Sequence, residues 1–423
     1  MLQSKKQISS NLLIYLVCFF IISFTFQNFF HSNSFKLVIV LLGVITYFRY
    51  IGKLEANAFF VMLLVSIIIA VQGVLFGYNL VSHFTSMFFN VFLIYVLLKI
   101  LPFNYHEYMI KIIYFLSVIS MILWLACNFS PAIHQSIPEI SERLGLDRVN
   151  EGSGISGGHE QILVFTYEKA MIFGIIRNAG FCHEPGGYAV ILIYALVFNT
   201  LLTKKFFSKK NMFFIVCLLT TFSTAGYAAL YIILLNNYLA KRRHIVGRAI
   251  GIILAVLISI YSFSTLDFMS SKISDQYNAQ AMADLNEETD GRIMGARKAL
   301  VVLSRYPFTG RGFLTVSQTG NLTSEEAAGY GFMTFASQVG IPLTIFAFVL
   351  FFRTLHFWSQ RVGFKKKNAL LFFLCFLPVL FSQTFIPSLL FNMIIFESLF
   401  RNYKGIKWSN KIEIPTNTTP TYA

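Results

Sequence analysis

The feature that most constrains this fold is a series of long stretches without a single charged residue. They are Gln7–Phe35, Ala56–Leu98, Ile112–Pro138, Pro185–Thr203, Asn211–Ala240, Ala249–Leu266, Ala327–Phe352 and Asn368–Phe396. An apolar run of roughly 18 residues or more is long enough to cross a bilayer as a helix. Lipid offers no partner for backbone N–H and C=O groups, so crossing segments have to be helical. The sequence therefore predicts an all-α polytopic membrane protein.

Charged residues separate into two populations along the chain. Fifteen of the 19 acidic residues lie in two segments, His134–Glu184 and Asp267–Glu326. Basic residues instead cluster between the apolar stretches, and such clusters mark the cytoplasmic side of a membrane protein. The clusters are Lys5–Lys6, Arg49 with Lys53, Lys99 with Lys111, Lys204–Lys210, Lys241–Arg248, Arg353–Lys367 and Arg401–Lys411. The net charge of +15 is thus spread over many connections rather than gathered on one soluble domain, which argues against a nucleic-acid partner.

If every basic cluster is cytoplasmic, the spans pair up between the clusters. The prediction is twelve spans, near 11–30, 35–51, 56–76, 83–101, 108–128, 185–203, 211–223, 225–240, 247–265, 329–353, 368–383 and 386–400. Residues 1–423 then form one membrane domain with two extracytoplasmic loops, 129–184 and 266–328. Two long stretches have to break, at Ser223–Gly226 and at Pro387, and interrupted spans often line polar cavities. In the alternative, each is one tilted helix and the count falls to ten.

Cysteine and histidine spacing gives no sign of a metal or a cofactor. The five cysteines show no C-x-x-C pattern. Cys127 and Cys182 flank the first loop, which leaves a disulfide as the alternative to the predicted pair of free thiols. His134, His159 and His183 share that loop without the spacing of a zinc site. We therefore expect no metal and no cofactor.

The sharpest local signal is the segment 177–187, where the first loop meets the next span. Pro185 suits the first turn of a helix, which places Glu184 at the helix N-terminus, where the helix dipole favours an anion. Gly180 and Gly186 let the backbone approach other groups closely. The alternative is a capped helix start without further function. If the segment is a site, its chemically active side chains are Arg177, His183 and Glu184.

The second loop carries a basic set of residues. Asp290 is placed to cap a helix over Gly291–Arg305, and the chain then reverses at Pro307–Gly312, where Gly310 and Gly312 suit a turn. Arginine forks match phosphate oxygens, so this loop suits a diphosphate. The alternative is an interfacial amphipathic helix that meets anionic lipid. The basic residues are Arg292, Arg297, Lys298, Arg305 and Arg311.

Taken in order, these motifs resemble those of bacterial O-antigen and exopolysaccharide polymerases of the Wzy type, which are relatives of the O-antigen ligases. The similar pattern is Arg-x-x-Gly-x-x-x-Glu-Pro before a span, Ser/Thr-x-Gly within a span, Gly-Arg, and Pro-x-x-Gly-x-Gly, over about residues 170–350. The resemblance implies a GT-C-like membrane glycosyltransferase without a metal. Such enzymes transfer a growing glycan from undecaprenyl pyrophosphate to a lipid-linked repeat unit at the outer face of the cytoplasmic membrane.

The resemblance also implies residue roles. Arg177 and Arg292, with Arg311, would bind the pyrophosphate, and Glu184 would act as the base with His183 behind it. Ligases keep a histidine before the span that follows the second loop, whereas this chain has Tyr330-Gly331-Phe332 there, which favours a polymerase. The implied partners are the lipid-linked oligosaccharide, membrane lipids, a chain-length regulator and a flippase. A ligase and a flippase or transporter are the alternatives.

Overall fold

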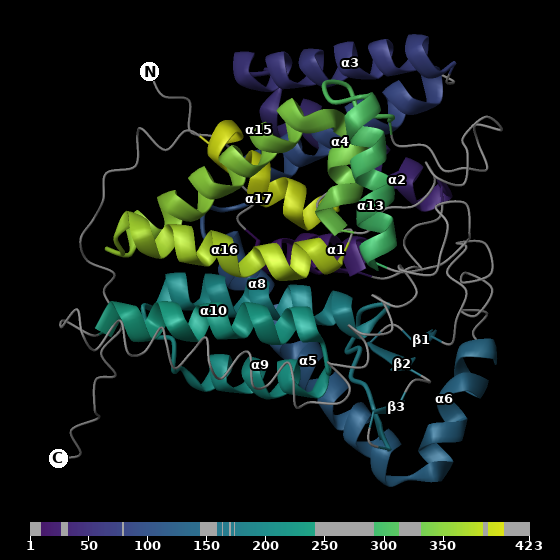
Figure 1. The fold of residues 1–423 in the computed structure, drawn as a ribbon, viewed down its shortest axis with the longest axis vertical. Coiled ribbons are helices and arrows are strands. Elements are labelled where there is room, and N and C mark those ends of the chain that lie inside the picture. Colours follow the sequence, from purple (N-terminus) through teal and green to yellow (C-terminus); the bar gives the residue numbers. More distant parts are fainter. Residues whose placement is uncertain are drawn as a thin grey trace.

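The structure is a computed structural model, and it describes residues 10–26, 33–77, 80–143, 159–162, 164–168, 171–172, 174–241, 292–312, 331–383 and 388–401. Helices dominate these residues (Figure 1). They are α1 Asn11–Phe26, α2 Asn33–Thr46, η2 Tyr47–Ile51, α3 Ala56–Phe76, α4 Leu80–Ile100, α5 Tyr105–Phe129, α6 Pro131–Arg143, α8 Pro185–Thr203, α9 Lys209–Thr220, α10 Thr224–Lys241, α13 Arg292–Arg305, α15 Gly331–Arg361, α16 Lys366–Ser382 and α17 Leu389–Phe400.

Four of the described helices are long and apolar enough to cross a membrane: α3, α5, α8 and α15. Shorter apolar helices cover Asn11–Thr25, Leu41–Ile51, Asn90–Ile100 and Leu389–Phe400. The fold is therefore that of a helical membrane protein, as the uncharged stretches predict. The expected span 247–265 lies outside the described residues.

Helix α8 runs through the middle of the molecule, and every residue from Pro185 to Leu201 is buried. It packs against α5, α9, α10 and α16, so its apolar surface faces other helices on all sides. A helix that is hydrophobic all round is stable only in such a position. The position of α8 matters for function because its first residues come directly after the segment 177–184.

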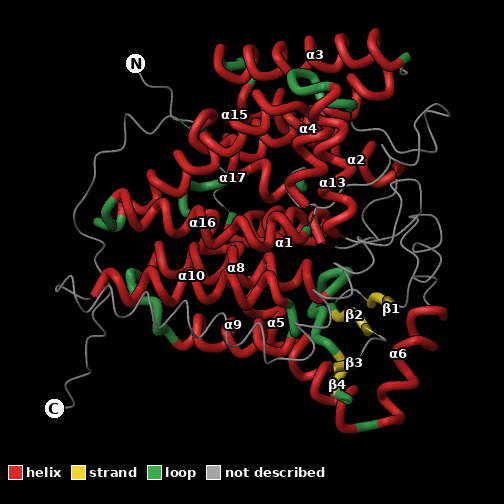
Figure 2. Tube along the Cα trace, in the orientation of Figure 1, coloured by secondary structure: helices red, strands yellow, loops and turns green. Residues whose placement is uncertain are grey.

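Hydrogen bonds and ion pairs between the termini of different helices define two ends of the described bundle. At one end, which we call the lysine end, Arg401 donates a hydrogen bond to the carbonyl oxygen of Pro102 at 3.3 Å, and Lys99 pairs with Glu55 at 2.6 Å. At the other, which we call the loop end, the backbone N–H of Asn178 donates to the carbonyl oxygen of Thr220 at 3.0 Å. The strands and α6 lie at the loop end, on the right of Figure 2.

The predicted break in the stretch Asn211–Ala240 is confirmed. Helix α9 ends at Thr220, and α10 begins at Thr224 after a tight turn in which Phe222 has φ of +48°. The Ser223 hydroxyl accepts a hydrogen bond from the N–H of Gly226 at 3.2 Å, so small and hydroxylated residues do form the reversal. The stretch Asn368–Phe396 is likewise divided, into α16 and α17, although Pro387 itself lies outside the described residues.

Four short strands in the first loop are a feature that the sequence did not predict. They form two antiparallel pairs, β1 His159–Ile162 with β2 Phe165–Glu168, and β3 Met171–Ile172 with β4 Ile175–Ile176. The indole N–H of Trp124 in α5 donates to the carbonyl oxygen of Ile176 at 2.7 Å. The last strand is thereby fixed to the loop end of α5. Their two- to four-residue length explains why no period of alternating residues revealed them.

Candidate functional site

The segment between β4 and α8 is held in place by hydrogen bonds to β2 and to the end of α9. The N–H of Thr166 in β2 donates to the carbonyl oxygen of Gly180 at 2.7 Å. The carboxamide of Asn178 donates to the Thr220 hydroxyl at 2.9 Å and accepts from the N–H of Gly180 at 2.9 Å. Asn178 is fully buried, so these bonds satisfy a carboxamide that would otherwise be costly to bury. The segment is therefore a built structure rather than a loose connection.

Arg177 lies against the turn between α9 and α10. Its Nε is 3.3 Å from the carbonyl oxygen of Thr221, and its Nη2 is 3.5 Å from that of Phe222. The side chain is half-buried. Both bonds are to backbone carbonyl groups of that turn. The break in the stretch Asn211–Ala240 thus orients the arginine that the sequence motif singles out.

His183 and Glu184 are in contact at the start of α8. The Nε2 atom of His183 lies 3.6 Å from Oε1 of Glu184, and the two side chains are 23% and 29% exposed. Glu184 is the N-cap residue of α8 and Pro185 its first residue, as predicted, but the Glu184 carboxylate makes no capping hydrogen bond. The carboxylate therefore does not cap its own helix, and an imidazole lies beside it.

Two glycines of the segment are required by close packing. Gly180 has φ of +59°, and a Cβ there would lie 2.6 Å from the ring of Tyr188. A Cβ on Gly186 would collide with the side-chain amide of Gln383, which follows the end of α16. The first turn of α8 therefore lies directly against the carboxamide of Gln383.

The second loop meets α15 where that helix is kinked. Gly340 in α15 has a non-helical conformation, with φ of 81° and ψ of 168°, two residues before Pro342. This kink leaves carbonyl groups without their helical partners. The backbone N–H of Arg311 donates to the carbonyl oxygen of Ser337 at 2.8 Å, and that of Gly312 donates to the carbonyl oxygen of Gln338 at 2.9 Å. Gly310 and Gly312, both with positive φ, form the predicted turn.

The structure places the arginines of the second loop differently from one another. Arg292 is the first residue of α13, but its side chain lies outside the description. Arg297 is exposed, whereas Arg311 is 5% exposed and sits beside α15 at the loop end. Gly291 and Asp290 lie outside the described residues. Of the proposed phosphate ligands, Arg177 and Arg311 are thus located at the loop end.

Sequence reasoning missed several buried polar residues near the loop end. Gln72 in α3 donates to the carbonyl oxygens of Thr309 and Gln338, at 2.6 and 2.9 Å, and so fixes the second loop to the bundle. On α15, the hydroxyl of Thr334 and Oε1 of Gln338 are buried and have no hydrogen-bond partner among the described residues. Glutamine within an apolar stretch is the signal that could have found Gln72, Gln338 and Gln383.

A second group that sequence reasoning missed is a buried cluster at the lysine end. His106 in α5 lies 2.7 Å from the Tyr194 hydroxyl through Nδ1 and 3.0 Å from Oε2 of Glu397 through Nε2. The Tyr105 hydroxyl donates to the same Glu397 oxygen at 3.1 Å. His106 and Glu397 are fully buried. The signal was visible in the sequence, because Glu397 is an acid at the end of a long apolar stretch.

The cysteines are free. All five are buried thiols, so the predicted pair of free thiols at Cys127 and Cys182 is confirmed over the alternative disulfide. Burial, with a smaller contribution from the nearby Glu184 carboxylate, raises the pKa of Cys182 well above its usual value. Among the described residues no group of three or more His, Cys, Asp or Glu side chains is placed to hold a metal ion. The side chains of His134 and His159 lie outside that description.

Comparisons of the chain with protein-family models, with curated proteins and with solved structures found no match. The observations that bear on function are therefore those of the chain itself. It is a helical membrane protein with two docked polar loops at one end of the bundle and a buried polar cluster near the other.

Proposed function

We propose that this protein is a polysaccharide polymerase that works at the outer face of the bacterial cytoplasmic membrane. It transfers a growing glycan from undecaprenyl pyrophosphate to the sugar of a lipid-linked repeat unit. The product is an O-antigen, capsule or exopolysaccharide chain. The observation that carries the proposal is the arrangement at the loop end, where Arg177, the His183–Glu184 pair and the start of α8 occupy one short segment.

Glycan transfer from pyrophosphate needs cationic hydrogen-bond donors and a general base, and both kinds of side chain lie at the loop end. Pyrophosphate leaves with additional negative charge, which arginine N–H groups stabilise without a metal. Arg177 and Arg311 supply such groups in the described loops, and we assign Arg292 to the same role. A carboxylate that removes a proton from the acceptor hydroxyl contributes about 10²–10⁴ in rate. Glu184 is the base in this scheme, and His183, at 3.6 Å, receives the proton or orients the carboxylate.

The sugar and the pyrophosphate also need hydrogen-bond partners. The buried Thr334 hydroxyl and Oε1 of Gln338 have none among the described residues. Buried polar atoms are normally paired, so a ligand rich in hydroxyls is a suitable partner for them. This supports a glycan substrate over an apolar one.

The proposal includes a topology of twelve spans in a GT-C-like arrangement, with the loop end outside and the lysine end in the cytoplasm. The segregation of acidic and basic residues supports it. The division of the stretch Asn211–Ala240 supports it too, because α9 ends and α10 begins at the same polar turn. A chain-length regulator and a flippase are the protein partners that this function needs.

The first experiment separates the candidate functions by the glycan that a deletion strain makes. Loss of a polymerase leaves a single repeat unit on the acceptor, loss of a flippase leaves none, and loss of a ligase leaves polymer on the undecaprenyl carrier. We expect the single repeat unit. Polymer retained on the carrier would identify a ligase instead.

The second experiment tests the arginines in the same strain. Lysine keeps the positive charge but loses the bidentate fork. We expect Arg177→Lys and Arg292→Lys to shorten the glycan ladder strongly at unchanged protein level. Arg143→Lys, on the exposed part of α6, is the matched control and should leave the ladder unchanged. Normal ladders from both Arg177→Lys and Arg292→Lys would remove these residues from the site.

Transport of a lipid-linked oligosaccharide is the second candidate, and one observation favours it. Transporters carry ionisable residues inside their spans. The sequence alone shows almost none, but the fully buried His106–Glu397 pair is of this kind. The deletion strain decides between the two functions, because it would lack surface glycan altogether if the protein were the transporter.

A further inference from the structure

The lysine end contains a pocket that the proposed polymerase reaction does not use. It lies between the end of α8, the second half of α10 and the start of α16, it opens to solvent, and its volume is about 50 Å³. Its lining residues are Thr200, Lys204, Phe206, Ile233, Asn236, Asn237, Phe364, Asn368 and Phe372.

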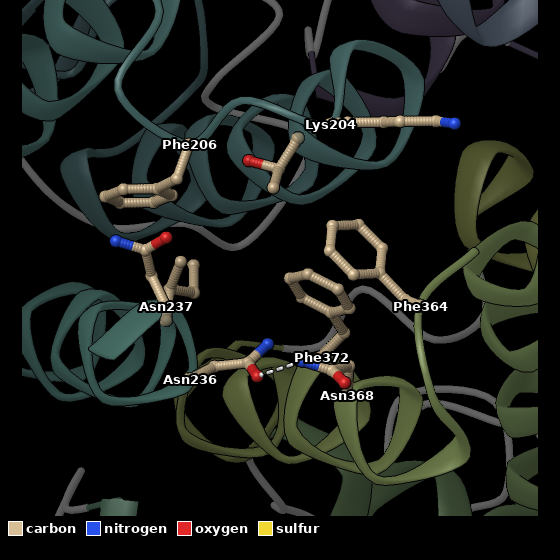
Figure 3. A pocket seen from close by; sticks show the side chains of 9 residues that line it. Lys204, Phe206, Asn236, Asn237, Phe364, Asn368 and Phe372 are labelled. Atoms are coloured by element: carbon tan, nitrogen blue, oxygen red, sulfur yellow. Dashed lines mark hydrogen bonds between the residues drawn. The ribbon is translucent and has the colours of Figure 1, made fainter. Parts of the chain in front are cut away.

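The lining combines an apolar part with a polar part. In Figure 3, Phe364 and Phe372 lie next to each other on one side of the pocket, and Phe206 and Asn237 lie opposite. Asn368 donates to Asn236 at 3.0 Å, which joins α16 to α10 and closes the pocket below. A ligand that fits this lining has both hydrogen-bonding oxygens and a hydrocarbon portion.

The walls of the pocket are built to keep their shape. The turn after α8, which carries Lys204 and Phe206, is fixed by the buried carboxamide of Asn211. That carboxamide donates to the Thr200 hydroxyl at 3.0 Å and to the carbonyl oxygen of Phe206 at 2.8 Å. The carboxamide of Asn199 adds a bond to the Ser208 hydroxyl at 3.0 Å. A fixed wall lowers the entropy that a ligand loses on binding.

The electrostatics of the pocket favour an anion. All lining residues come from two segments, 185–266 and 327–396, that contain no acidic residue at all. Lys204 lines the pocket, and the neighbouring Lys365, Lys366 and Lys367 are exposed at the start of α16. Lys204 extends away from the other lining side chains in Figure 3, and a turn of its flexible stem brings the ammonium group toward a bound phosphate.

We propose that this open pocket binds the phosphate group of an anionic phospholipid, with the glycerol at its open side. The phosphate lies against Lys204 and the side-chain amide of Asn237, and the first carbons of the acyl chains pack on Phe364 and Phe372. Basic pockets between spans on the cytoplasmic side of membrane proteins bind anionic lipid head groups in this way. The site is distinct from the loop end and does not depend on the polymerase proposal.

The test uses the full-length protein in nanodiscs of phosphatidylcholine, with and without phosphatidylglycerol. We expect phosphatidylglycerol to raise the midpoint of thermal unfolding in a saturable way and to remain bound in native mass spectrometry. Lys204→Gln should bind phosphatidylglycerol about tenfold more weakly, because a charge-assisted hydrogen bond is lost, and Asn237→Leu should act in the same direction. Lys209→Gln, on an exposed lysine outside the pocket, is the matched control and should bind like the unchanged chain.

Three results would overturn the proposal. The first is an absence of stabilisation by phosphatidylglycerol. The second is equal stabilisation of the unchanged chain and of Lys204→Gln, which would mean diffuse attraction to the lysine end. The third is stabilisation of the protein in phosphatidylcholine nanodiscs by inorganic phosphate to the same extent as by phosphatidylglycerol. That result would make the ligand a free cytoplasmic phosphate. Lys204 is exposed, so Lys204→Gln keeps the test valid even if Asn237→Leu folds poorly.

Discussion

At the scale of single residues, the two carboxylates Glu184 and Glu397 have opposite surroundings. Glu184 sits at the helix start with partial exposure and an imidazole at 3.6 Å. Glu397 is fully buried and receives a hydrogen bond from Tyr105 at 3.1 Å, with His106 at 3.0 Å. A partly exposed carboxylate suits chemistry on a substrate, whereas a fully enclosed one suits helix positioning or proton movement.

The first residue-scale prediction concerns the base. Glu184→Gln keeps the shape and a hydrogen-bonding group, so the protein should accumulate normally while polymerisation falls by about 10²–10⁴, the value of a general base. The measurement is the glycan ladder together with the turnover of a purified lipid-linked repeat unit. If Glu184→Gln polymerises normally and His183→Ala does not, the histidine is the base. Normal polymerisation by both variants would show that this segment supplies no base.

The second residue-scale prediction concerns the buried cluster. Glu397→Ala leaves His106 and the Tyr105 hydroxyl buried without their shared partner, so we expect the free energy of unfolding to fall by about 3–5 kcal/mol. Glu107→Ala is the control, because Glu107 pairs with Lys111 at an exposed site, and such pairs contribute about 1 kcal/mol or less. Denaturant unfolding in detergent measures both. Equal losses from the two variants would contradict the structural role of the cluster.

At the scale of elements, the turn between α9 and α10 and the kink in α15 act in the same way. Each interrupts a helix at the loop end. The interruption leaves backbone carbonyl groups without their helical partners, and residues of a loop donate hydrogen bonds to them. Arg177 uses those of Thr221 and Phe222, and the N–H of Arg311 uses that of Ser337. An unpaired carbonyl is costly within a membrane protein, so the breaks and the loops stabilise each other.

The element-scale prediction tests the contact between α8 and the residue that follows α16. Gly186→Ala places a methyl group against the Gln383 carboxamide, and we expect a loss of about 1 kcal/mol in the free energy of unfolding, at the low end for overpacking because the end of the glutamine side chain can shift. Gln383→Ala removes the colliding group. In that background Gly186→Ala should cost little more, because contacting residues are not additive. Full additivity of the two changes would mean that the helices do not meet at this point.

At the scale of the whole molecule, the orientation in the membrane follows from charge. The described acids outside the two loops are Glu55, Glu107 and Glu397, and each is near a basic residue or a histidine. The exposed lysines of the turns after α8 and after α15 have no such acids near them in sequence. On the positive-inside rule, the proposed orientation has the lysine end in the cytoplasm.

The whole-molecule prediction is a labelling pattern in intact cells. Glu139→Cys on exposed α6 and Asn286→Cys in the second loop should react with an impermeant thiol reagent, and Lys205→Cys in the turn after α8 should not. The native background is low, because all five cysteines are buried. Cys182, the one in the first loop, has a raised pKa, so its thiol stays protonated and unreactive at neutral pH. Labelling of Lys205→Cys in intact cells would reverse the proposed orientation.

The sequence by itself determined the class of fold and many local features. Its uncharged stretches required membrane helices, because lipid cannot satisfy an exposed backbone. Pro185 marked the start of α8, the small residues near Ser223 marked a reversal, and the glycines at 310 and 312 marked a turn. Each of these features depends on residues only a few positions apart, so the sequence alone was enough to predict it.

Only the tertiary structure decided which distant residues meet. His106 and Glu397 are 291 positions apart, and Gln72 reaches a loop 237 positions away, so no local pattern could pair them. The short strands also depend on α5 for their position. Burial and hydrogen bonding between helices are long-range properties. Whether a polar residue in an apolar stretch joins a buried pair, holds a loop or lines a pocket depends on the helix that packs against it.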